Sequence, residues 1–195
     1  VFADIPSNLP DGRKRPVIGF LAHLDTAPAV SGANVRPRVI RNYDGGDITL
    51  GTSGLVLSPE RFHDLKYCAG QTLITTDGTT LLGADDKAGV AEIMTACERI
   101  VKENPPHCAV AVAFTPDEEI GSGAQLLDLE RFGADFAYTV DGDEVGEINY
   151  ETFNAAAASW EIRGVTVHPG SAMGITITAA LGACEINSLL TAEEI

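Results

Sequence analysis

The sequence has few cysteines, and it lacks any long apolar run. The four cysteines are Cys68, Cys97, Cys108 and Cys184, and none forms a C-x-x-C pair, which argues against a thiolate zinc site. No apolar run reaches the roughly 18–20 residues needed to span a bilayer, and no signal peptide precedes the first expected strand. A reducing cytoplasm is therefore the simplest compartment. Because the chain begins at Val1 rather than Met, we expect it to be part of a longer protein.

Basic residues are also scarce. The 195 residues include 13 Lys+Arg against 28 Asp+Glu, a formal net charge of −15. Nucleic acids and anionic membranes require a basic face, so we expect neither as a partner. Hydrophobic residues make up 45% of the chain and the mean hydropathy is +0.08, which is sufficient for a packed core. Most acidic residues are expected on the solvated surface, although bound metal ions could offset some of them.

Apolar runs that alternate with amphipathic segments predict an α/β fold. Strands are expected at 16–22, 45–50, 71–75, 109–114 and 136–140. Helices are expected at 88–102 and 121–132. Asp77-Gly78 predicts a turn that returns the chain toward 81–82. The acidic Asp85-Asp86 pair directly precedes the first helix, where carboxylates meet free backbone N–H groups.

The character of the sequence changes after Tyr150. We expect a strand over 155–164 and an apolar segment over 175–190 that is helical in its second half. A domain boundary is expected near 149–154. The 40 or so residues beyond it are too few for an independent domain.

Four short motifs stand at the expected ends of strands. They are His23-Leu24-Asp25, Gly83-Ala84-Asp85-Asp86-Lys87, Asp117-Glu118-Glu119 and Val140-Asp141-Gly142. Ligands of α/β sheets bind outside the carboxyl ends of the strands, so these motifs can converge on one crevice. Nitrogen and oxygen ligands of this kind hold paired Zn²⁺ ions, and a spare carboxylate beside them can act as a base.

Each motif alone has a simpler explanation. Asp25 could fix the tautomer of His23, or the pair could be a turn histidine beside an N-capping aspartate. Asp85-Asp86 could be an ordinary helix cap, Glu118-Glu119 an exposed acidic loop, and Asp141-Gly142 a turn. Only their combination and order favour a metal site.

In this order the motifs resemble the dizinc exopeptidase superfamily of bacterial aminotripeptidases, carboxypeptidases and N-acyl-diamine deacylases. Segments 42–48, 71–78 and 153–156 favour the aminotripeptidases. The resemblance implies the N-terminal part of a three-layer, mixed-sheet α/β catalytic domain over residues 1–152. Residues 153–195 would then begin an α+β lid domain through which such chains form homodimers.

The resemblance also implies the metal ligands. His23, Asp85, Glu119 and Asp141 would hold two Zn²⁺ ions, for which Co²⁺ or Mn²⁺ could substitute, and Asp85 would bridge them. No residue matches the histidine that completes the second zinc site of these enzymes near the C-terminus of a longer chain. We therefore expect weakened metal binding there and little turnover from these 195 residues.

Three further residues receive catalytic or binding roles from the resemblance. Glu118 would be the general base, Asp25 would orient His23, and His168 would contact the substrate from the lid. The substrate would be a small peptide, a tripeptide with a free N-terminus. A related carboxypeptidase, an N-acyl amino-acid deacylase and a non-catalytic remnant remain alternatives.

Overall fold

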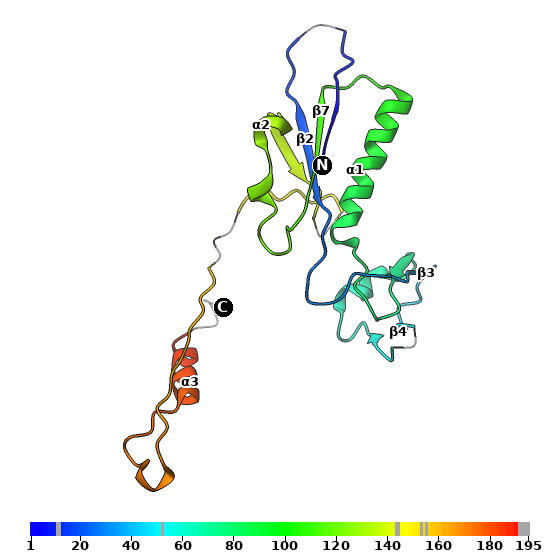
Figure 1. The fold of residues 1–195 in the computed structure, drawn as a ribbon. Helices are drawn as coiled ribbons and strands as arrows, with labels where there is room; N and C mark the ends of the chain where they lie inside the picture. Colours follow the sequence, from blue (N-terminus) through cyan, green and yellow to red (C-terminus); the bar gives the residue numbers. More distant parts are fainter. Residues whose placement is uncertain (11–12, 52, 143–144, 153, 155, 191–195) are drawn as a thin grey trace. The chain divides into compact units, whose positions relative to one another are not determined.

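The computed structural model describes residues 1–10, 13–51, 53–142, 145–152, 154 and 156–190. The chain divides into two compact units, Val1–Asn149 and Tyr150–Ile195 (Figure 1). The first unit contains every strand of the main sheet and the long helix. The second contains one α-helix, one short 3₁₀ helix and no named strand among its described residues.

A four-stranded mixed sheet forms the centre of the first unit. Its strands lie in the order β1 (Phe2–Ile5), β7 (Val110–Thr115), β2 (Ile18–His23) and β8 (Phe136–Thr139). Strand β2 runs parallel to both β7 and β8, whereas β1 runs antiparallel to β7. The carboxyl ends of three parallel strands therefore meet at one edge of the sheet.

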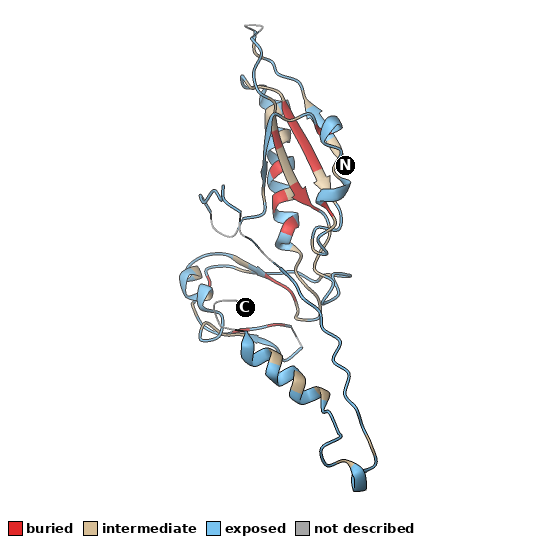
Figure 2. Ribbon diagram, turned by 90° about the vertical axis from the view of Figure 1, so that its left-hand side faces the viewer, coloured by how far each residue is buried: buried red, intermediate tan, exposed pale blue. Residues whose placement is uncertain are grey.

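Helices cover both faces of this sheet, so the unit has three layers. Helix α1 (Ala84–Glu103) packs on one face, where Ile93 joins Ala22, Val110 and Val112 in one buried cluster. On the other face Phe132, from the short helix α2 (Leu129–Phe132), packs on Ala111 and Ala113. Side chains of β7 alternate between the two clusters because successive strand residues face opposite sides. Figure 2 shows the buried residues, in red, on the strands and the adjoining helix. The expected α/β fold is confirmed.

Residues 38–75 of the first unit form two small antiparallel pairs. Strand β3 (Arg38–Ile40) pairs with β6 (Leu73–Thr75), and β4 (Ile48–Thr49) pairs with β5 (Val56–Leu57). A 3₁₀ helix, η1, spans His63–Cys68. Tyr43, Ile48 and Leu50 form a separate buried cluster, against which Ile40, Leu57 and Leu73 of these strands pack.

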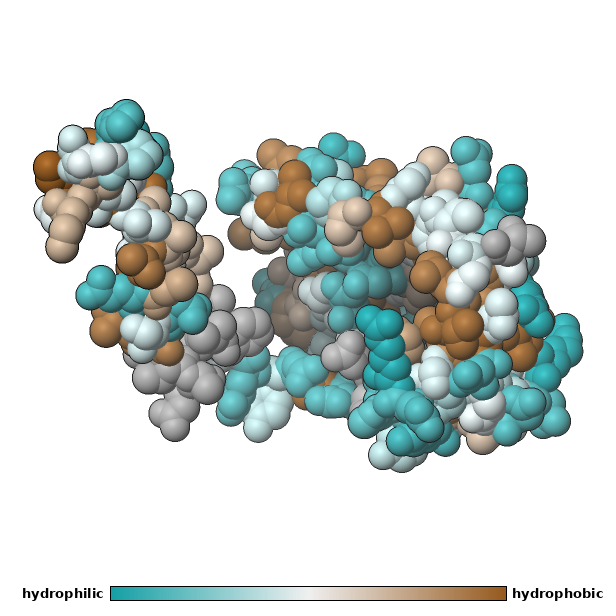
Figure 3. Space-filling model, turned by 90° about the horizontal axis from the view of Figure 1, so that it is seen from below, coloured by the Kyte–Doolittle hydropathy of each residue, from teal (hydrophilic) through white to brown (hydrophobic). Residues whose placement is uncertain are grey.

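The second unit consists of an isolated bridge, a short 3₁₀ helix and one α-helix. The bridge joins Val165 to Ile177, η3 spans Pro169–Ser171 and α3 spans Ala179–Leu189. None of the described residues of this unit is buried. Figure 3 shows the hydropathy of the molecular surface, on which exposed apolar side chains (brown) lie among hydrophilic ones.

Several expected elements differ from the observed ones. The helix expected over 121–132 is replaced by the 3₁₀ turn η2 (Ala124–Leu126) and the single-turn α2, with Gly121 at φ +72°. The chain was expected to turn at Asp77-Gly78 and run back toward residues 81–82. The partner of β6 is instead strand β3. No strand forms among the described residues of 155–164, and residue 155 lies outside them. No helix among the described residues is long and apolar enough to cross a membrane.

Candidate metal centre

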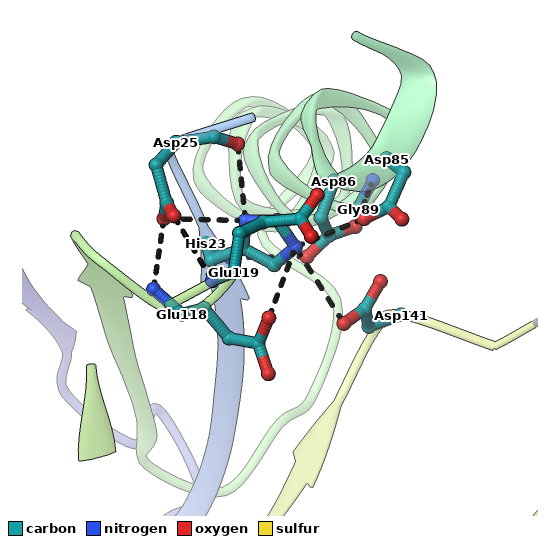
Figure 4. Close-up of polar contacts among 8 residues, drawn as sticks. All are labelled: His23, Asp25, Asp85, Asp86, Gly89, Glu118, Glu119 and Asp141. Atoms are coloured by element: carbon teal, nitrogen blue, oxygen red, sulfur yellow. Dashed lines mark hydrogen bonds and ion pairs between the residues drawn. The ribbon is translucent and has the colours of Figure 1, made fainter. Parts of the chain in front are cut away.

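The four motifs converge at the carboxyl edge of the sheet. His23 ends β2, Glu118 and Glu119 follow β7, Asp141 follows β8, and Asp85 opens α1. Figure 4 shows these side chains directed toward one another. The edge forms because β2 pairs in parallel with both β7 and β8, which brings segments far apart in sequence to the same level.

His23 is the centre of this cluster. It is only 2% exposed. Its Nε2 lies 2.9 Å from Oδ1 of Asp85, 3.7 Å from Oδ2 of Asp141 and 3.9 Å from Oε2 of Glu118. One imidazole nitrogen thus faces carboxylates from three different segments.

Asp25 has a different arrangement from the one expected. Its carboxylate lies 3.4 Å from Nδ1 of His23, and that nitrogen lies closer, 3.1 Å, to the backbone carbonyl oxygen of Asp25. The carboxylate oxygens instead accept hydrogen bonds from the backbone N–H groups of Glu118 and Glu119, at 3.1 and 3.0 Å. Asp25 therefore fixes the loop that carries the two glutamates as well as the imidazole.

Asp86 is a residue of the site to which the sequence assigned no separate role. It is 2% exposed. One of its oxygens accepts a hydrogen bond from the backbone N–H of His23 at 3.0 Å, and the other accepts one from Gly89 at 3.2 Å. A Cβ atom at Gly89 would lie 2.0 Å from the carbonyl oxygen of Val140. Because glycine has no Cβ atom, Gly89 permits the close approach of α1 to the residue that follows β8.

The electrostatics of the cluster reflect crowded negative charge. Burial, together with the charges of Asp86 and Asp85, raises the pKa of Asp141 to about 6. Burial also raises the pKa of Asp86. For His23, burial lowers the pKa, but the hydrogen bond to Asp85 and the nearby carboxylates outweigh it and leave the pKa raised.

Asp25 is the exception, because its pKa is lowered. Burial opposes this change, and the hydrogen bonds from the backbone of Glu119 and Glu118 outweigh it. The raised pKa values of Asp141 and Asp86 show that their charged forms are disfavoured in this cluster. A bound cation would stabilise those charged forms.

The donor atoms fit a divalent cation. Two groups of three have their ligand atoms within 4.8 Å of one another: His23 with Glu118 and Asp141, and His23 with Asp85 and Glu119. Imidazole nitrogen and carboxylate oxygen are common ligands of Zn²⁺. His23 belongs to both groups, so one histidine serves the whole cluster among the described residues.

The other three histidines contact residues outside this cluster. His168 belongs to the second unit, where its Nδ1 accepts a hydrogen bond from the N–H of Gly170 at 3.2 Å. His63 and His107 contact the backbone carbonyl oxygens of Glu60 and Cys108. The six other expected site residues come together in the first unit, while the role of His168 stays a prediction.

The fold and the site together define a class: α/β proteins with a metal-binding edge built from one histidine and several carboxylates. A family profile described as peptidase family M20/M25/M40 matches residues 76–184, more than half of the 195 residues. The chain belongs to this peptidase family, whose membership implies use of a divalent metal. The match includes Asp85, Glu118, Glu119 and Asp141. The expected exopeptidase resemblance is thus confirmed.

Two relatives illustrate the similarity along the whole chain. Peptidase T from Halothermothrix orenii is 54% identical over 198 residues, covering 100% of this chain and 48% of that protein. Peptidase T from Geobacillus kaustophilus is 55% identical over 196 residues, covering 100% of this chain and 47% of that protein. The chain spans about half the length of the curated relatives it matches.

Solved structures agree on the fold. A tripeptidase from Staphylococcus aureus is 28% identical with a TM-score of 0.51, covering 73% of this chain and 29% of that one. Aminopeptidase PepT from Bacillus cereus is 24% identical with a TM-score of 0.58, covering 97% of this chain and 42% of that one. At that identity the second likeness bears on the fold alone.

Proposed function

We propose that the chain is the metal-binding part of an aminopeptidase that releases the N-terminal residue of tripeptides. The supporting geometry is the approach of Asp85, Asp141 and Glu118 to within 3.9 Å of Nε2 of His23. Peptidase T relatives at 54–55% identity favour a tripeptide as the substrate. Metal ligands alone do not specify where a peptide is cut, so the substrate rests on that similarity.

Two Zn²⁺ ions are the proposed cofactors, with Co²⁺ or Mn²⁺ as substitutes. Such ions supply Lewis-acid polarisation of the peptide carbonyl group and a lowered pKa for the attacking water. In this proposal His23 and Asp141 would hold one ion and Glu119 the other, and Asp85 would be a ligand shared by both. Asp25 keeps His23 and the loop of the two glutamates in place through the hydrogen bonds described above.

Glu118 is the proposed general base. Its side chain is 54% exposed and its Oε2 is 3.9 Å from Nε2 of His23, so it stands beside the metal ligands while remaining open to solvent and substrate. It accepts the proton of the attacking water and donates it to the leaving amine. His168 is the proposed substrate contact, contributed by a lid domain.

The second ion is proposed to bind more weakly to these 195 residues. Both groups of candidate ligands depend on His23, because no second histidine lies in either. Neither group among the described residues therefore offers the second ion a nitrogen ligand of its own.

The proposed protein acts on small peptides in the cytoplasm. Residues 1–152 are its proposed catalytic part, and residues 153–195 are the proposed start of a dimer-forming lid.

The first test compares a tripeptide with its N-acetylated twin. The complete reading frame that contains this chain is incubated with zinc and each peptide, and the products are identified by mass spectrometry. Release of the first residue from the free peptide alone supports the aminopeptidase. Cleavage of the blocked peptide would indicate a carboxypeptidase or an N-acyl amino-acid deacylase, and cleavage of neither would indicate a non-catalytic remnant.

The second test separates the base from the ligands. In the complete protein Glu118→Gln is expected to lower kcat about 10²–10⁴-fold, with bound zinc unchanged because this proposal makes Glu118 the base and leaves the metal to the other residues. The matched change Glu119→Gln is expected to lower the zinc content. Loss of zinc from Glu118→Gln, measured by elemental analysis, would show that Glu118 is a ligand and the base assignment wrong.

A further inference from the structure

Asp85 and Asp86 are adjacent but face different surroundings. The side chain of Asp85 is 71% exposed and approaches Nε2 of His23. Asp86 is 2% exposed, and Figure 4 draws it among the residues of the site. Neither group of candidate metal ligands among the described residues includes Asp86. Its carboxylate is therefore engaged with the protein rather than with the candidate metal position.

Both oxygens of Asp86 bind backbone N–H groups. Oδ2 accepts from His23 at 3.0 Å and Oδ1 accepts from Gly89 at 3.2 Å. The first bond fixes the backbone of His23, the histidine that both ligand groups share among the described residues. The second fixes the first turn of α1 directly after Asp85. One buried carboxylate thus ties two segments that are 63 residues apart in sequence.

Gly89 extends this connection to the third segment. A Cβ atom there would lie 2.0 Å from the carbonyl oxygen of Val140 and 2.5 Å from Oδ1 of Asp86. The turn of α1 that donates to Asp86 therefore lies directly against the residue before Asp141. The segments that carry His23, Asp85 and Asp141 meet around the Asp86 carboxylate.

We propose that Asp86 is a positioning residue: its buried carboxylate holds His23 and the start of α1 together, and so sets the affinity and geometry with which the cluster binds a divalent cation. The proposal rests on the proposed function, because it assumes a metal at this edge. Groups that orient metal ligands typically change metal affinity by about 10–100-fold when they are removed. Asp86 acts through His23 and Asp85 and is not a ligand itself.

Asp86→Asn is the sharpest variant because it keeps the shape of the side chain. The amide retains one acceptor oxygen, so its NH₂ group must face one of the two backbone N–H donors. The amide NH₂ group and a backbone N–H are both donors, so they cannot form a hydrogen bond with each other. We therefore expect His23 or the first turn of α1 to shift while the ligands themselves remain.

The experiment titrates Co²⁺ into the 195-residue chain and records its visible absorption spectrum, which reports coordination geometry. Asp86→Asn is expected to bind as many ions at saturation as the unaltered chain, with about 10–100-fold weaker affinity and shifted absorption bands. Asp85→Asn, a ligand change, is expected to reduce the number of ions bound. Asp64→Asn, at an exposed aspartate of η1, is the matched control and should leave both quantities unchanged.

Three results would overturn the proposal. Asp86→Asn with unaltered affinity and spectrum would leave Asp86 a purely structural residue, even if the melting temperature fell. A reduced number of ions, as for Asp85→Asn, would make it a ligand. If the unaltered chain bound no Co²⁺ at all, the proposed function would fail first, and this proposal with it.

A second variant applies if circular dichroism shows that Asp86→Asn does not fold. Asp86→Glu keeps both acceptor oxygens and the charge but is one methylene longer, so it would displace His23 relative to Asp85. Shifted absorption bands with weaker Co²⁺ affinity are expected. A spectrum and affinity identical to those of the unaltered chain would overturn the proposal.

Discussion

The two units of the chain differ in how they bury their side chains. In the first unit Ala113 is 0% and Val112 2% exposed, within a sheet covered on both faces. In the second unit Leu181 is 70% and Ile177 61% exposed, and none of the described residues is buried. The first unit is therefore stabilised by apolar side chains that pack within the unit itself. The second has apolar side chains but no core of its own to receive them.

This difference explains why the candidate site lies where it does. Ligands must be held within tenths of an ångström to bind a metal well, and the buried ends of β2 and β7 provide such rigidity. The 11-residue helix α3 has no comparable support, because isolated helices of that length are marginally stable in water. Identical substitutions in the two units should therefore have very different effects.

The largest expected effect comes from a charge placed in the sheet. Ala113→Asp buries an unpaired carboxylate on the face of β7 that packs with Phe132, and should destabilise the first unit by more than about 4 kcal/mol, enough to unfold it. The matched change Ala183→Asp lies on exposed α3 and should cost less than about 1 kcal/mol. Circular dichroism and urea unfolding measure both. Equal losses for the two variants would contradict the contrast between the units.

A smaller effect is expected from removing apolar atoms. Ile93 is 4% exposed and packs on β2 and β7, whereas Ile175 of the second unit is 54% exposed. Ile93→Ala should lower the free energy of unfolding by about 2–4 kcal/mol, and Ile175→Ala by about 0.5 kcal/mol or less. Urea unfolding midpoints give both values. A cost above about 1 kcal/mol for Ile175→Ala would mean that the second unit does bury this side chain.

Sequence patterns predicted the first unit better than the second for a physical reason. Continuous apolar runs predicted β2, β7 and β8 to within about two residues, because buried parallel strands carry no polar alternation. Helix α1 was predicted from its apolar stripe. Strand β1 was not predicted, since it has only four residues and their burial does not alternate. The strand expected over 155–164 did not form among the described residues of that range, because a lone apolar segment forms a strand only where a partner strand is available.

The same reasoning applies to the site. Motif order at strand ends predicted which residues converge, since parallel pairing puts the ends of β2, β7 and β8 at one edge. It did not distinguish the exposed Asp85 from the buried Asp86. Nor did it show that Asp25 accepts hydrogen bonds from the backbone of Glu118 and Glu119. Such contacts depend on tertiary distances that no local pattern encodes.

The smallest expected effect is a pH dependence of the stability of the first unit. Asp141 has a pKa raised from 3.8 to about 6, chiefly by burial, and His23 has a pKa raised above 6.5. The folded, metal-free chain therefore binds more protons than the unfolded chain above pH 3.8. By linkage, the contribution of Asp141 makes the stability fall as the pH rises from 3.8 through about 6. The contribution of His23 makes it fall further above pH 6.5.

Urea unfolding in EDTA at several pH values between 4 and 7.5 tests this expectation. A loss on the order of 1 kcal/mol is expected from Asp141 over this range. Asp25 has a lowered pKa, so its opposite contribution acts below 3.8, outside the window. Asp141→Asn should flatten the profile, and saturating Zn²⁺ should reverse it because protons compete with the metal for the same ligands. Metal-free stability that stays flat or rises with pH would show that the carboxylates around His23 are not crowded in the folded chain.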